Sequence, residues 1–345
     1  MAVENPEENI RDAALRLHME EEKRRKTDPN ESHERSLIII GSKSVGKTTM
    51  LYRFLERDET PKPTIAIDYS FGRKAGKSLV KNIMHVWEVG QLIPSLVSAA
   101  LAGASLTHSP HHITVLIMLD LAKPDMLWSS LEGALSVMQS RLKMNYDNNM
   151  IQELKDRRIK ERKKSLERGV DPFPIRLCFI GGKYDEFKEL DLNIKEEVGR
   201  MLRAVAHTLG AGLHYHSSKD KTLVRKSKDL LSHYGFGTQV AEGKCTDFEK
   251  PLSISPGLDS YSQIDLQLSQ IKPSEILTTI KQIYISHIPQ ISRKDEIPVE
   301  DPSNDPNFNE PIIDRLRAQR EEEIDVLLND MLEGQTAQIL IPDPV

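Results

Sequence analysis

The sequence predicts an α/β fold, a doubly wound and mostly parallel six-stranded sheet with helices on both faces. Three observations support this prediction. The octapeptide GSKSVGKT at 41–48 matches the phosphate-loop pattern G-x-x-x-x-G-K-[ST]. An apolar, strand-like run at 36–40 precedes it, and 49–55 follows with apolar residues at helical spacing. Beyond it, short apolar runs alternate with helical stretches as far as about residue 237.

The octapeptide has the chemistry of a nucleotide-binding loop. Its glycines let backbone N–H groups point at a phosphate, Lys47 is expected to reach the β- and γ-phosphates, and the Thr48 hydroxyl can ligate Mg²⁺. The following helix adds the positive end of its dipole. A phosphate loop that no longer holds a nucleotide is the alternative. The residues expected to contact the nucleotide here are Gly41, Ser42, Lys43, Ser44, Val45, Gly46, Lys47, Thr48 and Thr49.

The strands are expected in short runs of apolar and β-branched residues. The run at 113–119 is almost wholly apolar and is therefore expected to be central. Helical stretches are clearest at 194–209 and 221–233. Together these elements predict a Ras-like P-loop NTPase fold. The six expected strands are 36–40, 64–69, 82–87, 113–119, 174–180 and 212–216.

Composition divides the chain into four parts. Residues 1–34 are polar and are expected to form a solvated arm, with a docking helix as the alternative. The Ras-like domain spans 35–240. It contains a basic insertion at about 141–168, expected to be a projecting, solvated helix or else a basic arm for an acidic partner. Residues 241–311 are expected to be an irregular extension and linker.

The last part, 312–345, is expected to be an amphipathic helix and a tail. Four apolar residues recur at helical spacing and form a seam, with acidic residues on the other faces. Such a seam must be buried, either on the domain itself or on a partner. The residues of the seam are Ile324, Leu327, Leu328 and Met331.

Composition also excludes several classes of protein. The chain has 345 residues, of which 38% are hydrophobic and 29% charged, and its net charge of −5 gives no sign of a nucleic-acid partner. The two cysteines, Cys178 and Cys245, lack metal-binding spacing and favour a reducing intracellular compartment. The N-terminus lacks the apolar core of a secretory signal. No run approaches 18 apolar residues, so membrane insertion is not expected.

Further groups of a Ras-like nucleotide site can be sought at their expected places. Thr64 lies sixteen residues after Thr48, where a switch threonine closes over the metal. Thr48 and Thr64 are therefore the expected metal ligands, although a threonine that merely starts a strand fits equally well. Gln91 lies where a water-positioning glutamine would be, and it is the one indication of hydrolysis.

The D-x-x-G element, whose Asp orients the metal, is altered to W-E-V-G. Counting back from Gly90 puts Trp87 in the position of the Asp. Shifting the register makes Glu88 the acid but shortens the turn by one residue. Both registers predict a changed metal site.

The base-reading loop N-K-x-D is also altered. Gly182 replaces the Asn that ties this loop to the phosphate loop, but Lys183 can still cover the base and Asp185 can still accept hydrogen bonds from guanine. Ser218 and Lys219 belong to an S-S-K element that is similar to the guanine-reading S-A-K element. The order and spacing of these groups favour guanine over adenine.

Turnover is expected to be slow, and no catalytic residue is assigned. An intact Ras-type site hydrolyses GTP at only about 3–5 × 10⁻⁴ s⁻¹ unaided, and an activating arginine adds roughly 10⁵-fold. A site without the metal-orienting Asp should be slower still. The expected cofactor is GDP or GTP with Mg²⁺ held as a structural ligand, because a ligand at 100 times its dissociation constant stabilises a fold by about 2.7 kcal/mol.

Several longer strings resemble the dynein light intermediate chain family. They are IIIGSKSVGKTT, the D-E-x-P-K-P-T-x-A-x-[DE]-Y stretch at 58–69, HVWEVG, LIMLDLAKPDMLW and PIRLCFIGGKYDEF. The resemblance covers roughly 36–264. The chain length, the string FEKPLSISPGLDSYSQI at 248–264 and the short C-terminal tail are most similar to the branch that belongs to cytoplasmic dynein 2, the motor of retrograde intraflagellar transport.

This resemblance implies a non-catalytic motor subunit whose Ras-like domain packs on the tail of the heavy chain. The implied partners are the dynein 2 heavy chain, other dynein 2 subunits and the intraflagellar transport machinery. The implied locations are the cytoplasm and cytoskeleton, the ciliary axoneme and the basal body. Two alternatives stay open: an active GTP-binding switch that regulates motor loading, and a free-standing small GTPase.

Overall fold

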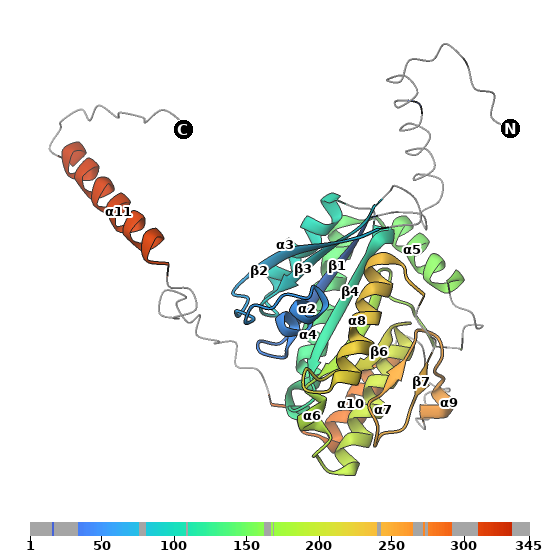
Figure 1. Cartoon of the computed structure of the whole chain (residues 1–345). Helices are drawn as coiled ribbons and strands as arrows, with labels where there is room; N and C mark the ends of the chain where they lie inside the picture. Colours follow the sequence, from blue (N-terminus) through green and yellow to red (C-terminus); the bar gives the residue numbers. More distant parts are fainter. Residues whose placement is uncertain are drawn as a thin grey trace. The chain divides into compact units, whose positions relative to one another are not determined.

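A mixed eight-stranded sheet forms the centre of the first of two structural units, Met1–Arg293 and Lys294–Val345 (Figure 1). The structure, a computed structural model, describes residues 16, 34–75, 81–107, 110–161, 167, 169–239, 243–264, 272, 275–291 and 310–332. The expected arm at 1–34 therefore lies almost wholly outside the described residues, as does the C-terminal tail. In the second unit the structure describes helix α11 (Pro311–Leu332) and the residue before it.

The strand order across the sheet is β2-β3-β1-β4-β5-β6-β8-β7. Strands β3, β1, β4, β5 and β6 are parallel, whereas β2 is antiparallel to β3, and β8 is antiparallel to β6 and β7. The α/β fold class is confirmed, and a strand lies at or near each of the six expected places, with β7 and β8 as additional short strands. The strand expected at 64–69 instead begins at Ile67 and extends to Ala75. The strands are β1 (Glu34–Gly41), β2 (Ile67–Ala75), β3 (Lys81–Val89), β4 (Ile113–Asp120), β5 (Arg176–Gly182), β6 (Gly212–Tyr215), β7 (Lys244–Cys245) and β8 (Ser253–Ile254).

Helices cover both faces of the sheet (Figure 1). Helices α3, α4 and α7 pack on one face, and α2 and α8 on the other. None of the described helices is long and apolar enough to cross a membrane. The helices of the first unit are α2 (Lys47–Phe54), α3 (Pro94–Thr107), the 3₁₀ turn η1 (Pro110–His112), α4 (Pro124–Asn145), α5 (Asn148–Lys160), α6 (Tyr184–Phe187), α7 (Leu192–Thr208), α8 (Lys221–Phe236), α9 (Tyr261–Ile264) and α10 (Ile276–His287).

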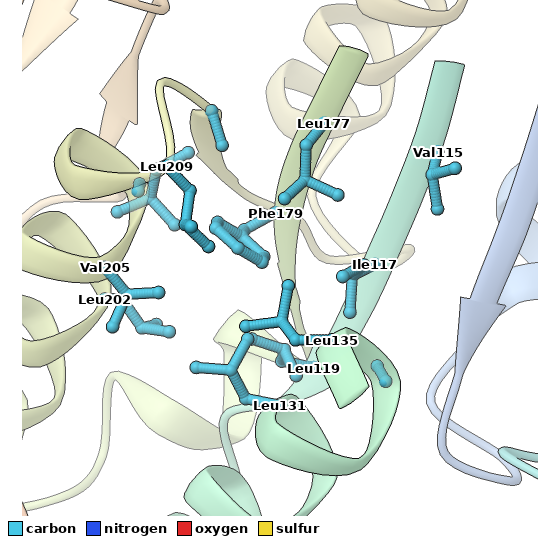
Figure 2. Close-up of a cluster of buried hydrophobic side chains, with 14 of the residues drawn as sticks. Val115, Ile117, Leu119, Leu131, Leu135, Leu177, Phe179, Leu202, Val205 and Leu209 are labelled. Carbon is cyan, nitrogen blue, oxygen red and sulfur yellow. The ribbon is translucent and has the colours of Figure 1, made fainter. Parts of the chain in front are cut away.

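The central strands are apolar at most positions because both faces of the sheet are buried. Side chains alternate between the faces, so Val115 and Ile117 of β4 belong to one core, and Leu116 and Met118 belong to the other. Figure 2 shows the first of these cores, in which the β4 side chains lie with those of β5 near helix α4, represented by Leu131. This double burial holds the parallel strands in register and aligns their ends.

The basic insertion differs from the solvated helix that its charge run predicts. Its first residues complete α4, and α5 begins after Asp147, whose side chain accepts a hydrogen bond from the backbone N–H of Met150 (2.9 Å). On α5, Leu154 is fully buried and Arg158 is only 9% exposed. A single Leu makes no apolar stripe, which is why the sequence pattern did not predict this packing. Residues 162–166 and 168 of the insertion lie outside the described residues.

The segment after residue 240 contributes to the first unit, which extends to Arg293. Strands β7 and β8 lengthen the sheet, and α10 packs against α7. Tyr261 of α9 and Tyr284 of α10 are each 1% exposed. An ion pair fastens this segment to α7: the guanidinium of Arg203 donates hydrogen bonds of 2.9 and 2.8 Å to the carboxylate of Asp259, and both side chains are buried.

Replacing Asp259 with Ala should destabilise the first unit by about 3–5 kcal/mol, because Arg203 would stay buried without its carboxylate. Urea unfolding of the full chain, followed by tryptophan fluorescence, measures the free energy of unfolding. The control is Glu189→Ala, which removes an exposed ion pair with Lys188 (3.5 Å) and should cost less than about 1 kcal/mol. Equal costs for the two substitutions would contradict a structural role for the buried pair.

Candidate functional site

The phosphate loop joins the carboxyl end of β1 to the start of α2, at the edge of the sheet where the parallel strands β4, β5 and β6 also end. Ligands of open α/β sheets bind at this edge. Gly46, directly before α2, has a φ of 104°, a left-handed conformation that glycine adopts at little cost. Of the other loop residues expected to contact the nucleotide, Val45 is buried, Ser42 and Thr49 are half-buried, and Lys43 and Ser44 are exposed.

Lys47 lies inside the loop and is only 4% exposed. Its ammonium donates hydrogen bonds to the carbonyl oxygens of Gly41 (3.2 Å), Ser42 (2.8 Å) and Gly90 (3.0 Å). Burial lowers the pKa of Lys47 to about 8, against the opposing effect of the nearby Glu88 carboxylate. A phosphate in the loop would give this buried ammonium a full counter-charge in addition to the carbonyl dipoles.

Thr48, Thr64 and Glu88 lie together beside the phosphate loop. The Thr48 hydroxyl donates a hydrogen bond to Oε1 of Glu88 (2.6 Å) and lies 3.3 Å from the Thr64 hydroxyl. Glu88 is fully buried, and burial is the main reason why its pKa is raised. Its Oε2 has no hydrogen-bond partner in the described part of the chain. Because Mg²⁺ prefers oxygen ligands, these three side chains fit a bound Mg²⁺.

The structure decides between the two registers of the W-E-V-G turn. Neighbouring residues of a strand point to opposite faces, so Glu88 faces the phosphate loop and Trp87 packs on the core beneath α3. Gly90 permits a close approach, because a Cβ there would lie 2.1 Å from the carbonyl oxygen of Thr64. That approach brings the Thr64 side chain to Thr48, as the sequence spacing predicts.

The base-reading loops also meet. The carboxylate of Asp185 accepts a hydrogen bond from the Ser217 hydroxyl (2.7 Å) and forms an ion pair with Lys219 (2.5 Å), while Ser218 between them is exposed. Burial acts to raise the pKa of Asp185, but the hydrogen bonds from Lys219 and Ser217 outweigh it and leave the pKa lowered. Because Lys219 is mostly exposed, its ion pair with Asp185 contributes little stability.

Lys183 and Gly182 determine how the loop after β5 lies against its neighbours. The Lys183 ammonium donates a hydrogen bond to the carboxylate of Asp120, the last residue of β4 (2.8 Å). A Cβ on Gly182 would lie 2.8 Å from the carbonyl oxygen of Val45. The two loops therefore touch through their backbones where an Asn side chain would otherwise link them.

Sequence analysis did not identify Asp120 and Ser217 as members of the site. Asp120 is the only charged residue in β4 and ends a strand that is apolar except for Thr114, which is a usable signal. Ser217 is the first residue of the S-S-K element, where only the next two residues were expected to contact the base. Their roles follow from the convergence of β4, β5 and the loop after β6 at one edge of the sheet.

The fold and the site define an α/β P-loop domain of the Ras-like class. A solved structure, described as the crystal structure of the dynein light intermediate chain's conserved domain, matches with a TM-score of 0.56. The match covers 76% of this chain and 94% of that chain at 13% sequence identity, and it therefore supports the fold alone. A scan against protein-family models matches none of them.

Several proteins named cytoplasmic dynein 2 light intermediate chain 1 are similar over most of the sequence. The Danio rerio protein is 32% identical over 331 residues, which cover 89% of this chain and 88% of that protein. The Bos taurus and Homo sapiens proteins are 33% and 32% identical over 325 residues, covering 86% of this chain and 88% of each. The chain therefore belongs to the dynein light intermediate chain family, and a role as a dynein subunit follows from that membership.

Gly182→Asn, which recreates the N-K-x-D pattern, should destabilise the domain by about 1–3 kcal/mol and should not strengthen nucleotide binding. The reason is the short distance from any Cβ at this position to Val45. Thermal unfolding of Gly182→Asn and Gly182→Ala measures the effect.

Gly133→Ala on α4 is the control for this prediction. Nothing lies within 4 Å of a Cβ at Gly133, so the substitution should gain up to about 1 kcal/mol from helix propensity. A Gly182→Asn protein that is more stable and binds nucleotide more tightly would show that a side chain fits between the loops.

Proposed function

We propose that this chain is a non-catalytic light intermediate chain subunit of the cytoplasmic dynein 2 motor, which braces the heavy chain for retrograde intraflagellar transport and cilium assembly. The observation that carries the proposal is the 32–33% identity to dynein 2 light intermediate chains over 86–89% of the chain. The proposed partners are the dynein 2 heavy chain, the other dynein 2 subunits and the intraflagellar transport machinery. The proposed locations are the cytoplasm, the cytoskeleton, the ciliary axoneme and the basal body.

The proposal includes GDP or GTP with Mg²⁺ as a structural ligand. Lys47 and the backbone N–H groups of 41–48 would hold the phosphates, and Asp185 would accept hydrogen bonds from the base, with Ser218 and Lys219 beside it. The carbonyl-bound ammonium of Lys47 and the unpartnered Oε2 of Glu88 support a site that receives a phosphate and a cation. In this role the nucleotide ties the phosphate loop to the loops that follow β3 and β5.

Rapid hydrolysis is not part of the proposal. The acid of the metal site, Glu88, stands one residue later than the Asp of D-x-x-G and is hydrogen-bonded directly to the metal-binding hydroxyl of Thr48. Burial raises the pKa of Glu88, so its charged form is disfavoured where an active site needs a full charge on the metal ligand. These features support binding without efficient turnover.

Helix α11 is the proposed second contact with a partner. The apolar seam at Ile324, Leu327, Leu328 and Met331 is exposed on this helix. An amphipathic helix with such a seam fits a hydrophobic groove of another protein. Docking of the same seam on the Ras-like domain is the alternative.

An active GTP switch is the second candidate function. It is supported by Thr64, which lies beside Thr48, and by Gln91, which follows the turn at Gly90. A switch requires that the heavy chain distinguish the GDP and GTP forms, so equal affinity for both forms would exclude it. A free-standing small GTPase is disfavoured by the roughly 100 residues after the domain and by the missing Asp. A monomeric, partner-free protein in ciliated cells would favour it.

Lys47→Ala should release bound nucleotide, while assembly with the dynein 2 heavy chain persists. At a nucleotide concentration 100 times the dissociation constant, the lost ligand should lower the free energy of unfolding by about 2.7 kcal/mol. Chromatography of extracted nucleotide, thermal unfolding and co-purification with the heavy chain measure these effects. The control is Lys143→Ala, at an exposed lysine of α4 outside the phosphate loop, which should keep the nucleotide. Brisk hydrolysis by the unmodified chain, lost together with assembly in Lys47→Ala, would contradict the proposal.

A further inference from the structure

A cleft of about 1370 Å³ lies in the first unit, with Arg35 of β1 and Arg176 of β5 among its lining residues. Both arginines stand at the amino ends of their strands. The phosphate loop lies at the carboxyl ends, so the cleft and the candidate nucleotide site are at opposite edges of the sheet. Further lining residues come from α5 and α8 and from the segments around β7 and β8.

Positive charge dominates the lining of this cleft. Six lysines and arginines line it: the arginines Arg35, Arg158 and Arg176, and the lysines Lys74, Lys226 and Lys244. The acidic residues on the lining are Glu161 and Asp229, and one of the lysines, Lys244, already pairs with the carboxylate of Asp259 (3.3 Å).

One carboxylate on the lining of the cleft accepts hydrogen bonds from several guanidiniums. Oε1 of Glu161 accepts hydrogen bonds from Arg158 (2.8 Å), Arg176 (3.1 Å) and Arg157 (3.3 Å). Arg35 is close enough for Arg176 and Glu161 to affect its pKa, which is lowered mainly by burial. Arg35, Arg158 and Arg176 therefore lie around one carboxylate of the lining, and they leave an excess of positive charge there.

Arg158 is the most deeply buried member of the cluster. It is 9% exposed, and its Nη2 bonds to Glu161, but its Nε and Nη1 have no hydrogen-bond partner among the described residues. Burial, followed by the charge of Arg176, lowers the pKa of Arg158 to about 10. The same surroundings lower the pKa of His112 to about 4, through burial and the nearby arginines. Buried donors of a charged group are costly unless an anion receives their hydrogen bonds.

Guanidinium groups bind phosphate and carboxylate oxygens through paired hydrogen bonds. A concave cleft encloses a compact ligand better than a flat surface does. Several guanidiniums around one cavity suit a ligand that presents several negative charges within a short distance. We propose that this cleft binds a compact ligand with several phosphate groups, which Arg158, Arg176 and Arg35 hold at the edge of the sheet opposite the phosphate loop.

Two kinds of molecule present several phosphate groups close together: a free inositol polyphosphate and the headgroup of a phosphoinositide lipid. Calorimetric titration of the full chain with inositol hexakisphosphate at about 0.15 M salt tests the site. The affinity should fall steeply as salt rises, and inorganic phosphate should bind far more weakly. Co-sedimentation with phosphatidylcholine vesicles, with and without phosphatidylinositol bisphosphate, then distinguishes the lipid source from the free one.

Arg158→Gln and Arg176→Gln should each lower the affinity for inositol hexakisphosphate by about tenfold or more, since each removes charge-assisted hydrogen bonds. Arg35→Gln provides a third variant on a different strand, and thermal unfolding without ligand shows that each variant is folded. The control is Arg225→Gln, which removes an exposed arginine of α8 that does not line the cleft. This control should bind as the unmodified chain does.

Lys47→Ala separates the cleft from the phosphate loop and should leave the affinity for inositol hexakisphosphate unchanged. Loss of binding in Lys47→Ala, or equal binding by Arg158→Gln, Arg176→Gln and Arg35→Gln and by the unmodified chain, would overturn the proposal. Tighter binding of a polyglutamate peptide than of inositol hexakisphosphate would overturn it in favour of an acidic protein segment.

Discussion

Burial of the central strands on both faces is the constraint on which the rest of the structure depends. Because β1, β4 and β5 are covered on both sides, their middle residues are mostly apolar, and the strands pair in parallel. Parallel pairing brings the carboxyl ends of the strands to one edge of the sheet and their amino ends to the other. The phosphate loop and the base-reading loops meet at the first edge, and the arginine-lined cleft forms at the second.

The candidate nucleotide site has a phosphate loop that matches the full pattern, but the neighbouring D-x-x-G and N-K-x-D elements are altered. Lys47 stays protonated below about pH 8 and is surrounded by carbonyl groups, so its environment suits an anion. Glu88, one residue after the position of the Asp in D-x-x-G, accepts a hydrogen bond from Thr48 of the phosphate loop. Gly182 brings two backbones into contact where a side chain would otherwise bridge them. The loops stay in contact, but different residues stand where a Ras-like site has the Asp of D-x-x-G and the Asn of N-K-x-D.

The segment after residue 240 is part of the same folded unit as far as Arg293. Its buried tyrosines and the Arg203–Asp259 pair attach β7, β8, α9 and α10 to the domain. A buried ion pair is costly to break but contributes little net stability over an apolar contact, so it chiefly specifies where the segment docks. A light intermediate chain that braces a larger partner would need such a fixed surface.

The sequence by itself determined the α/β class, the six main strands, the phosphate loop and the family, because these depend on local periodicity and on contiguous strings. It also placed Thr64 opposite Thr48 through spacing alone. Only the tertiary structure decided that Glu88 faces the loop, that Asp120 and Ser217 complete the base-reading side, and that Arg158 is buried beside Arg176. These contacts join residues from separate elements, and which of them meet depends on strand order and packing, which no local pattern encodes.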